Sequence, residues 1–116
     1  MKIRRDSLDI LFSKYIRMRA DGICEYCGKR LALQCSHFHG RRKRSTRWDE
    51  ENCCAICMSC HMYLGEHPNK HYEWFKKRLG SERFEALNIR AEIIVKLDKE
   101  EIKAGLKEKL QIMEGE

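Results

Sequence analysis

The sequence has no apolar run long enough to cross a membrane. Charges also interrupt its first residues, MKIRRDSLDILF, where a secretion signal would be apolar. These absences argue against a membrane-spanning or secreted protein and predict a cytoplasmic one. Internal repeats and low-complexity linkers are lacking as well. With 116 residues, the chain is expected to form one domain with a core small enough to benefit from a bound metal.

Positive charge is concentrated in the first two thirds of the chain. Residues 1–80 contain 17 Lys and Arg against 9 Asp and Glu, whereas residues 81–116 contain 7 against 9. A basic part joined to a mildly acidic tail suggests that the first part contacts a polyanion. An ordinary solvated surface would also fit a chain in which 36% of the residues are charged.

The hydrophobic pattern predicts helices around a short pair of strands. Apolar residues at helical spacing indicate a helix over residues 7–19, capped by Asp6 or Ser7. A strand is expected over residues 31–39, LALQCSHFH, and a second short strand should end near Cys57, where another helix begins. The remaining helices are expected from Pro68 to Gly80, from Ser81, and after a capping box at residues 98–101.

Two C-x-x-C pairs dominate the seven cysteines. Cys24 and Cys27 form the first pair, and Cys57 and Cys60 form the second, with 29 residues between them. Each pair can turn two thiolates toward one tetrahedral zinc ion, so the spacing predicts a structural zinc site. Cys54 with Cys57 would also make a C-x-x-C. Cys35, Cys53 and Cys54 are interpreted as small buried core residues, with Cys35 a weaker candidate ligand.

Two other uses of these cysteines are less compatible with the sequence. An odd number of cysteines in a cytoplasmic chain argues against a disulfide framework. The segment from Cys57 to His61 fits the C-x-x-C-H pattern of haem attachment, but such haems are usually attached outside the cytosol. A structural metal therefore remains the preferred interpretation.

Three further polar residues are spaced around the predicted zinc site. His37 lies on the first expected strand, Asn52 at the start of the second, and His61 directly after the last zinc-binding cysteine. Each alone is more simply a strand histidine, a turn asparagine or a surface histidine. Their order within a paired C-x-x-C frame is more informative than any one of them.

The combined pattern resembles the zinc-stapled HNH endonucleases, particularly small phage and prophage members of the NinG type. The resemblance covers residues 24–61 firmly and residues 62–90 loosely. It implies an α+β protein with a ββα-metal, treble-clef-like core at residues 24–67 and helical scaffold at residues 7–19 and 68–113. In this sequence the pattern consists of Cys24, Cys27, His37, Asn52, Cys57, Cys60 and His61.

The resemblance also implies a mechanism of DNA hydrolysis. His37 would be the general base that activates water, since a neutral imidazole can take a proton near neutral pH. Asn52 would hold the loop and orient the backbone of His37. His61 would bind a catalytic Mg²⁺ or Mn²⁺ that neutralises the phosphate. The products would be a 5′-phosphate and a 3′-hydroxyl.

The sequence departs from the family pattern beside the proposed base. Many members have an aspartate there as a metal ligand, whereas this chain has Ser36, a poor ligand for Mg²⁺. The candidate cation ligands are His61, His37, Ser36 and His39. A site made by His61 and an imidazole such as His39 or His67 would favour Mn²⁺, Co²⁺ or Ni²⁺ over Mg²⁺. A nearby carboxylate (Asp49, Glu50 or Glu66) could substitute, or the site could be inactive.

A basic loop lies between His37 and Asn52. Phosphate contacts from such a loop position a nucleic acid without reading its sequence, so DNA nicking of low sequence specificity is expected. A double-strand break would usually need two sites, and hence a dimer. A non-catalytic zinc module that binds nucleic acid is the alternative. The expected phosphate contacts are Arg41, Arg42, Lys43, Arg44 and Arg47.

Overall fold

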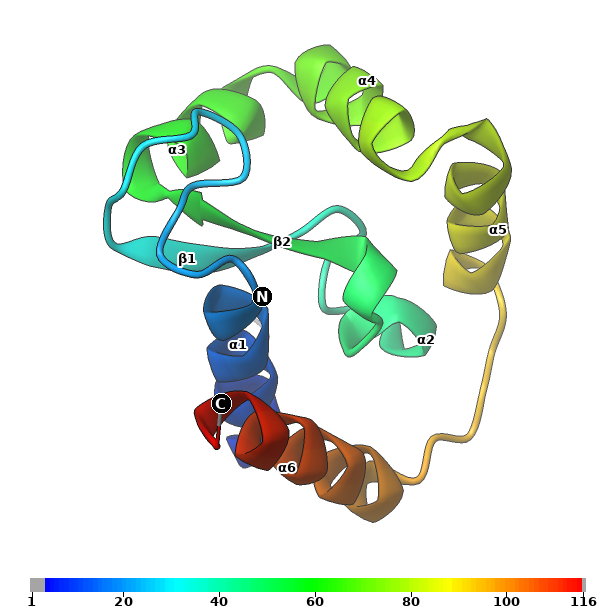
Figure 1. The fold of residues 1–116 in the computed structure, drawn as a ribbon. Helices are drawn as coiled ribbons and strands as arrows, with labels where there is room; N and C mark the ends of the chain where they lie inside the picture. Colours follow the sequence, from blue (N-terminus) through cyan, green and yellow to red (C-terminus); the bar gives the residue numbers. More distant parts are fainter. Residues whose placement is uncertain (1–3, 116) are drawn as a thin grey trace.

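A computed structural model describes residues 4–115. An antiparallel hairpin lies at its centre (Figure 1), formed by β1, Leu33–His37, and β2, Cys53–Cys57. In this hairpin Leu33 lies opposite Cys57, and His37 lies opposite Cys53. The loop between the strands contains the short helix α2, Arg44–Arg47, and the 3-10 helix η1, Glu50–Asn52. The other helices are α1, Ser7–Arg19; α3, Met58–Glu66; α4, Pro68–Leu79; α5, Ser81–Ala91; and α6, Lys99–Glu114.

The helix ends follow from local sequence signals. Asp6 caps α1 through a reciprocal capping box with Asp9. Pro68 occupies the first turn of α4, where a missing N–H has no cost, and Asp98 caps α6 by accepting from the backbone of Glu101. The predicted helices over residues 7–19, from Pro68 to Gly80, from Ser81 and after residue 98 are therefore confirmed, with Gly80 as the C-cap of α4.

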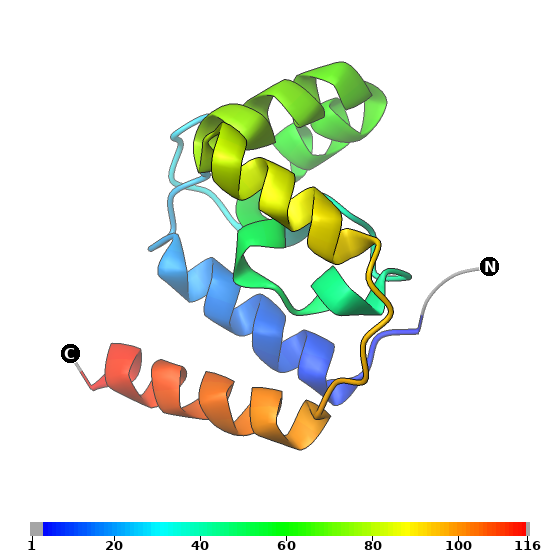
Figure 2. The same ribbon diagram turned by 90° about the vertical axis from the view of Figure 1, so that its right-hand side faces the viewer.

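The two faces of the hairpin pack against two separate groups of helices. Cys53 and Ala55 face α1 and α6, which lie side by side in Figure 2. Cys54 and Ile56, the alternate residues of β2, face the layer formed by α3, α4 and α5. Because every residue of β2 is buried, the strand is a central element with a core on each side.

These elements form an α+β fold with six α-helices and a two-stranded sheet within residues 4–115. The first strand is shorter than the predicted 31–39, because Leu31 is exposed and the backbone N–H of His39 bonds a side chain outside the sheet. Among the described residues, no helix is both long and apolar enough to cross a lipid bilayer.

Candidate functional site

Four thiols meet where the turn after α1 approaches the junction of β2 and α3. The sulfur atoms of Cys24, Cys27, Cys57 and Cys60 all lie within 4.8 Å of one another. Those of Cys27 and Cys57 are 3.9 Å apart, close to the edge of about 3.8 Å expected for a tetrahedron with zinc–sulfur bonds of 2.3 Å. The predicted four-cysteine set is thus assembled, and it could hold a structural metal such as zinc.

The turn that carries the first pair is shaped by its glycine and by backbone hydrogen bonds. Gly28 has a positive φ of 78°, which favours glycine, and its N–H donates to the carbonyl of Cys24 at 2.9 Å. The backbone N–H groups of Cys27 and Cys57 point at the sulfur of Cys24, at 3.5 and 3.3 Å. Such donors stabilise a thiolate, the form that binds metal.

The thiols of the second pair differ in acidity. A hydrogen bond with the hydroxyl of Ser59 lowers the pKa of the Cys57 thiol to about 6, whereas burial raises the pKa of Cys60. Cys60 therefore needs a nearby positive charge to ionise, and a divalent cation in the cluster would provide it.

Glu25 fixes this turn to the sheet, a role that the sequence did not indicate. Its side chain accepts from the backbone N–H of Ala55 at 2.6 Å, and its own N–H donates to the carbonyl of Ala55 at 3.0 Å. Arg78 of α4 donates to the same carboxylate at 2.7 Å. The turn, β2 and α4 are thus held together beside the cluster.

The remaining cysteines lie outside this cluster. Cys53 and Cys54 are fully buried, which confirms their interpretation as core residues, and Cys35 is half-buried. Cys54 packs in the same core as Cys24, Cys57 and Cys60 but is not one of the four grouped thiols, so the alternative pairing of Cys54 with Cys57 is not the one that the structure forms. All seven cysteines are free thiols.

His37 ends β1 on the face that packs against α1. Its ring centroid is 6.2 Å from that of Phe12, and its Nε2 lies 2.9 Å from the carbonyl oxygen of Arg47. A carbonyl can only accept, so Nε2 carries the proton and Nδ1 keeps its lone pair. Burial lowers the pKa of His37 below its usual value, which favours the neutral ring.

Asn52 is fully buried and holds the loop after β1. Its Oδ1 accepts from the N–H of His39 at 2.8 Å, while its Nδ2 donates to the carbonyls of His39 and Thr46 at 2.9 and 3.0 Å. The side chain thus fixes the backbone at residues 39 and 46 rather than at His37. Its effect on His37 is indirect, because Thr46 is the neighbour of Arg47, whose carbonyl accepts from the ring of His37.

Replacing Asn52 by alanine should destabilise the protein by about 2–4 kcal/mol, because buried backbone groups of His39 and Thr46 lose their partner. Urea unfolding measures this free energy. Asn88→Ala is the matched control, because half-buried Asn88 bonds only the ring of His39, at 2.8 Å, and its loss should cost less than about 1 kcal/mol. Equal stabilities of the two variants would contradict this role of Asn52.

The histidines predicted to bind a catalytic cation are not brought together. His61 bonds Gln34 at 2.8 Å, and Gln34 is separated by an odd number of positions from His37 on β1. His61 therefore lies on the opposite face of the hairpin from His37. Ser36 is buried, and His39 bonds Asn88 instead. Within residues 4–115, His39 and His61 belong to no metal-sized group of His, Cys, Asp or Glu ligands, so the structure does not bring the predicted ligand set together.

The basic loop is only partly available to a polyanion. Arg42 and Arg44 are exposed, whereas Lys43 bonds Glu92 at 2.6 Å and the side chain of Arg41 lies 3.8 Å from Asp9. Arg47 is buried with its guanidinium against Asp9, so the structure does not present it at the surface with the rest of the predicted phosphate contacts. The predicted phosphate contacts therefore reduce to the exposed part of the loop.

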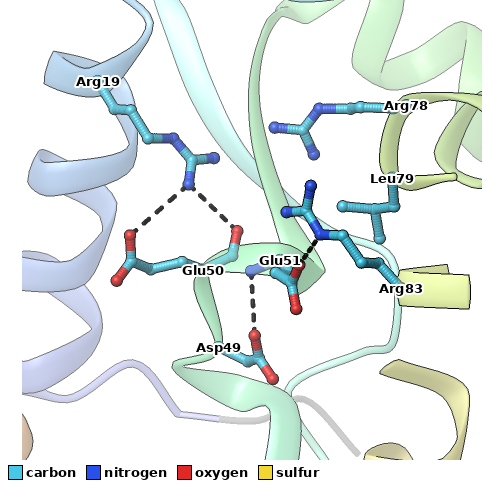
Figure 3. A pocket seen from close by; sticks show the side chains of 7 residues that line it. All are labelled: Arg19, Asp49, Glu50, Glu51, Arg78, Leu79 and Arg83. Carbon is cyan, nitrogen blue, oxygen red and sulfur yellow. Dashed lines mark hydrogen bonds and ion pairs between the residues drawn. The ribbon is translucent and has the colours of Figure 1, made fainter. Parts of the chain in front are cut away.

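A pocket of about 490 Å³ opens beside the start of β2 (Figure 3). Its charges are largely paired with one another. Arg19 lies against Glu50, and Arg83 against Glu51. Arg19 and Arg78 also donate to the carbonyl of Cys53, at 3.0 and 3.2 Å. The side chains that line the pocket therefore carry no surplus of either charge.

Comparison with protein-family models, with curated proteins and with solved structures finds no match for this chain. The functional assignment consequently depends on the arrangement of its own residues.

Proposed function

We propose that this protein is a DNA endonuclease of the HNH type, built on a ββα-metal core, that nicks DNA with little sequence specificity. The observation that carries the proposal is the fixed loop after β1. Asn52 holds the backbone of His39 and Thr46 there, and Arg47 supplies the carbonyl that orients His37. The order of β1, β2 and α3 with the four-cysteine cluster supports the same assignment.

The proposed base is Nδ1 of His37. Its lone pair would take a proton from water, whose oxygen then forms a bond to phosphorus. The bond from phosphorus to the 3′ oxygen breaks, and the leaving oxygen is protonated by solvent. The exposed side chains of Arg42 and Arg44 would contact flanking phosphates. Mg²⁺ or Mn²⁺ is the cation that the resemblance implies. No oxygen-rich cluster for either ion forms among residues 4–115, so the proton transfer by His37 is the only step assigned to named residues.

A non-catalytic zinc module that binds nucleic acid is the second candidate. The separation of His37 and His61 on opposite faces of the hairpin favours it, because a binding module has no need of both histidines at one phosphate. The two candidates differ in whether His37 affects cleavage.

A supercoiled-plasmid assay tests the proposal. The protein is assayed with Mg²⁺, Mn²⁺, Co²⁺ or Ni²⁺ beside His37→Ala and the control His67→Ala, which alters an exposed imidazole bonded to the carbonyl of Tyr63. We expect open-circle product, reduced at least about 100-fold by His37→Ala and unchanged by His67→Ala.

Circular dichroism and bound-metal analysis show whether each variant is folded. Equal cleavage by folded His37→Ala would exclude the proposed base. Protein that binds DNA but cleaves with none of the metals would instead be the non-catalytic module.

A further inference from the structure

A second group of potential metal ligands lies on the face of the hairpin that packs against α1. We propose that Cys35, His37 and Cys53 form a second metal site for a thiophilic divalent cation such as Zn²⁺, separate from the four-cysteine cluster. One ligand atom from each of the three residues lies within 4.8 Å of the other two. That separation is compatible with three corners of a tetrahedral site, whose edges are about 3.5 Å with mixed sulfur and nitrogen ligands.

The hairpin register explains why these residues meet. His37 and Cys53 are directly opposite each other, and Cys35 is two residues before His37 on the same face of β1. The three side chains thus come from adjacent positions on two hydrogen-bonded strands, and their spacing is set by the sheet. Strand alternation alone puts Cys35 and His37 on one face, but the contribution of Cys53 depends on the register of the hairpin.

The orientation of His37 suits a metal ligand. Histidines that bind metals usually donate their other ring N–H to a carbonyl or carboxylate, which fixes the tautomer. His37 makes this contact through Nε2 with the carbonyl of Arg47 at 2.9 Å, leaving the lone pair of Nδ1 for a cation.

The surroundings of the two thiols favour a bound cation. A hydrogen bond from the Cys53 thiol, followed by the charges of Arg19, Arg17 and Arg5, lowers the pKa of Cys35, while burial raises the pKa of Cys53. Cys35 is thus the more readily ionised of the two thiols, and a bound divalent cation would favour the thiolate form of both.

The donor set selects the class of metal. Two sulfurs and one imidazole suit Zn²⁺ or Co²⁺ and are poor ligands for Mg²⁺. Three protein ligands leave a fourth position of a tetrahedral site for a water or another ligand, and Cys35 and His37 are only half-buried. Cys54 is fully buried on β2, beside Cys53, but belongs to neither group of potential metal ligands.

Metal stoichiometry tests the site directly. Protein prepared with a non-chelating reductant and loaded with Zn²⁺ or Co²⁺ should hold two ions per chain, one for each group of ligands. Cys35→Ala should hold one ion and should lose part of the thiolate-to-cobalt absorption. Cys54→Ala, the control from the opposite face, should retain two. One ion in both the natural protein and folded Cys35→Ala would overturn the proposal.

Cys53→Ser is a second variant that tests the site if Cys35→Ala does not fold. Serine has a volume similar to that of cysteine, and the metal content should fall to one ion per chain. Retention of two ions by the folded Cys53→Ser protein would equally exclude this ligand set.

If the proposed function is correct, a metal bound at this second site should inhibit DNA cleavage. A cation on Nδ1 of His37 would occupy the lone pair of the proposed base, so micromolar Zn²⁺ should inhibit DNA nicking and Cys35→Ala should relieve the inhibition. The stoichiometry does not depend on cleavage. Two ions without nicking would therefore support the metal site alone, whereas nicking by a one-ion protein would support the nuclease alone.

Discussion

Cys57→Ser should abolish the cooperative folding of the hairpin and α3. Cys57 is the last residue of β2, its sulfur lies 3.9 Å from that of Cys27, and α3 begins at the next residue. Structural zinc contributes about 10–16 kcal/mol in small peptides, which is comparable to the total stability of a domain, about 5–15 kcal/mol. Far-UV circular dichroism, the melting temperature and bound zinc should all decrease together.

Cys54→Ser is the control for this prediction, because Cys54 is equally buried on the same strand and lies outside the four-cysteine cluster. It should lower stability by about 1–3 kcal/mol, the cost of an unpaired buried hydroxyl, and should keep the zinc. If Cys57→Ser melts at the same temperature as Cys54→Ser, the cluster makes no structural contribution through a metal.

Local signals were sufficient for the helices and for the four-cysteine cluster. The range of α1 was predicted because Asp6 or Ser7 could cap it and because its apolar residues recur with the helical period, and Asp6 is the cap in the structure. The two C-x-x-C pairs were informative because short turns constrain the direction of their own sulfurs. Neither inference needs any knowledge of residues distant in the chain.

The placement of the histidines could not be obtained in this way. Strand alternation predicts that His37 and His39 share a face only if the strand continues to residue 39. In the structure β1 ends at His37, because the backbone N–H of His39 donates to the side chain of Asn52. The position of His61 depends on how α3 packs against the hairpin, where it contacts Gln34. Motif spacing along the chain contains no information about these contacts.

The positions of Trp48 and Arg47 likewise depend on contacts that the local sequence does not predict. Both belong to a basic stretch between His37 and Asn52 that looks like a solvent-facing loop. Trp48 instead joins the core formed with α1 and α6, with its Nε1 3.0 Å from Asp9. The partner is 39 residues away in the sequence, and no local pattern in α1 identifies it.

Asp9→Ala should cost about 3–5 kcal/mol, because it leaves the charge of Arg47 buried without its carboxylate partner. Asp9 is buried, with only 6% of the residue exposed. Its carboxylate accepts hydrogen bonds from Arg47, from the indole of Trp48 and from the backbone N–H of Asp6. One side chain thus joins α1 to the loop that positions His37. Urea unfolding at neutral pH gives the difference in free energy.

The double variant Asp9→Ala/Arg47→Met tests whether the loss comes from the unpaired charge. It should be more stable than Asp9→Ala alone, because neither ion remains buried. Additive losses would mean that Asp9 and Arg47 act independently, contrary to their ion pair.

The same carboxylate gives the stability a specific dependence on pH. Burial alone would raise the pKa of Asp9, but hydrogen bonds from Arg47, the backbone of Asp6 and Trp48 lower it from 3.8 to about 2. Because the folded pKa is lower than the unfolded one, the contribution of about 2 kcal/mol is present above about pH 4 and is lost as the pH falls toward 2. Asp9→Asn cannot titrate, so its unfolding free energy should fall less steeply over this range. If the unfolding free energy of both proteins falls equally steeply with pH, the acid sensitivity arises from other carboxylates. Protonation of Asp9, which joins α1 to Arg47, would then not be the cause of acid unfolding.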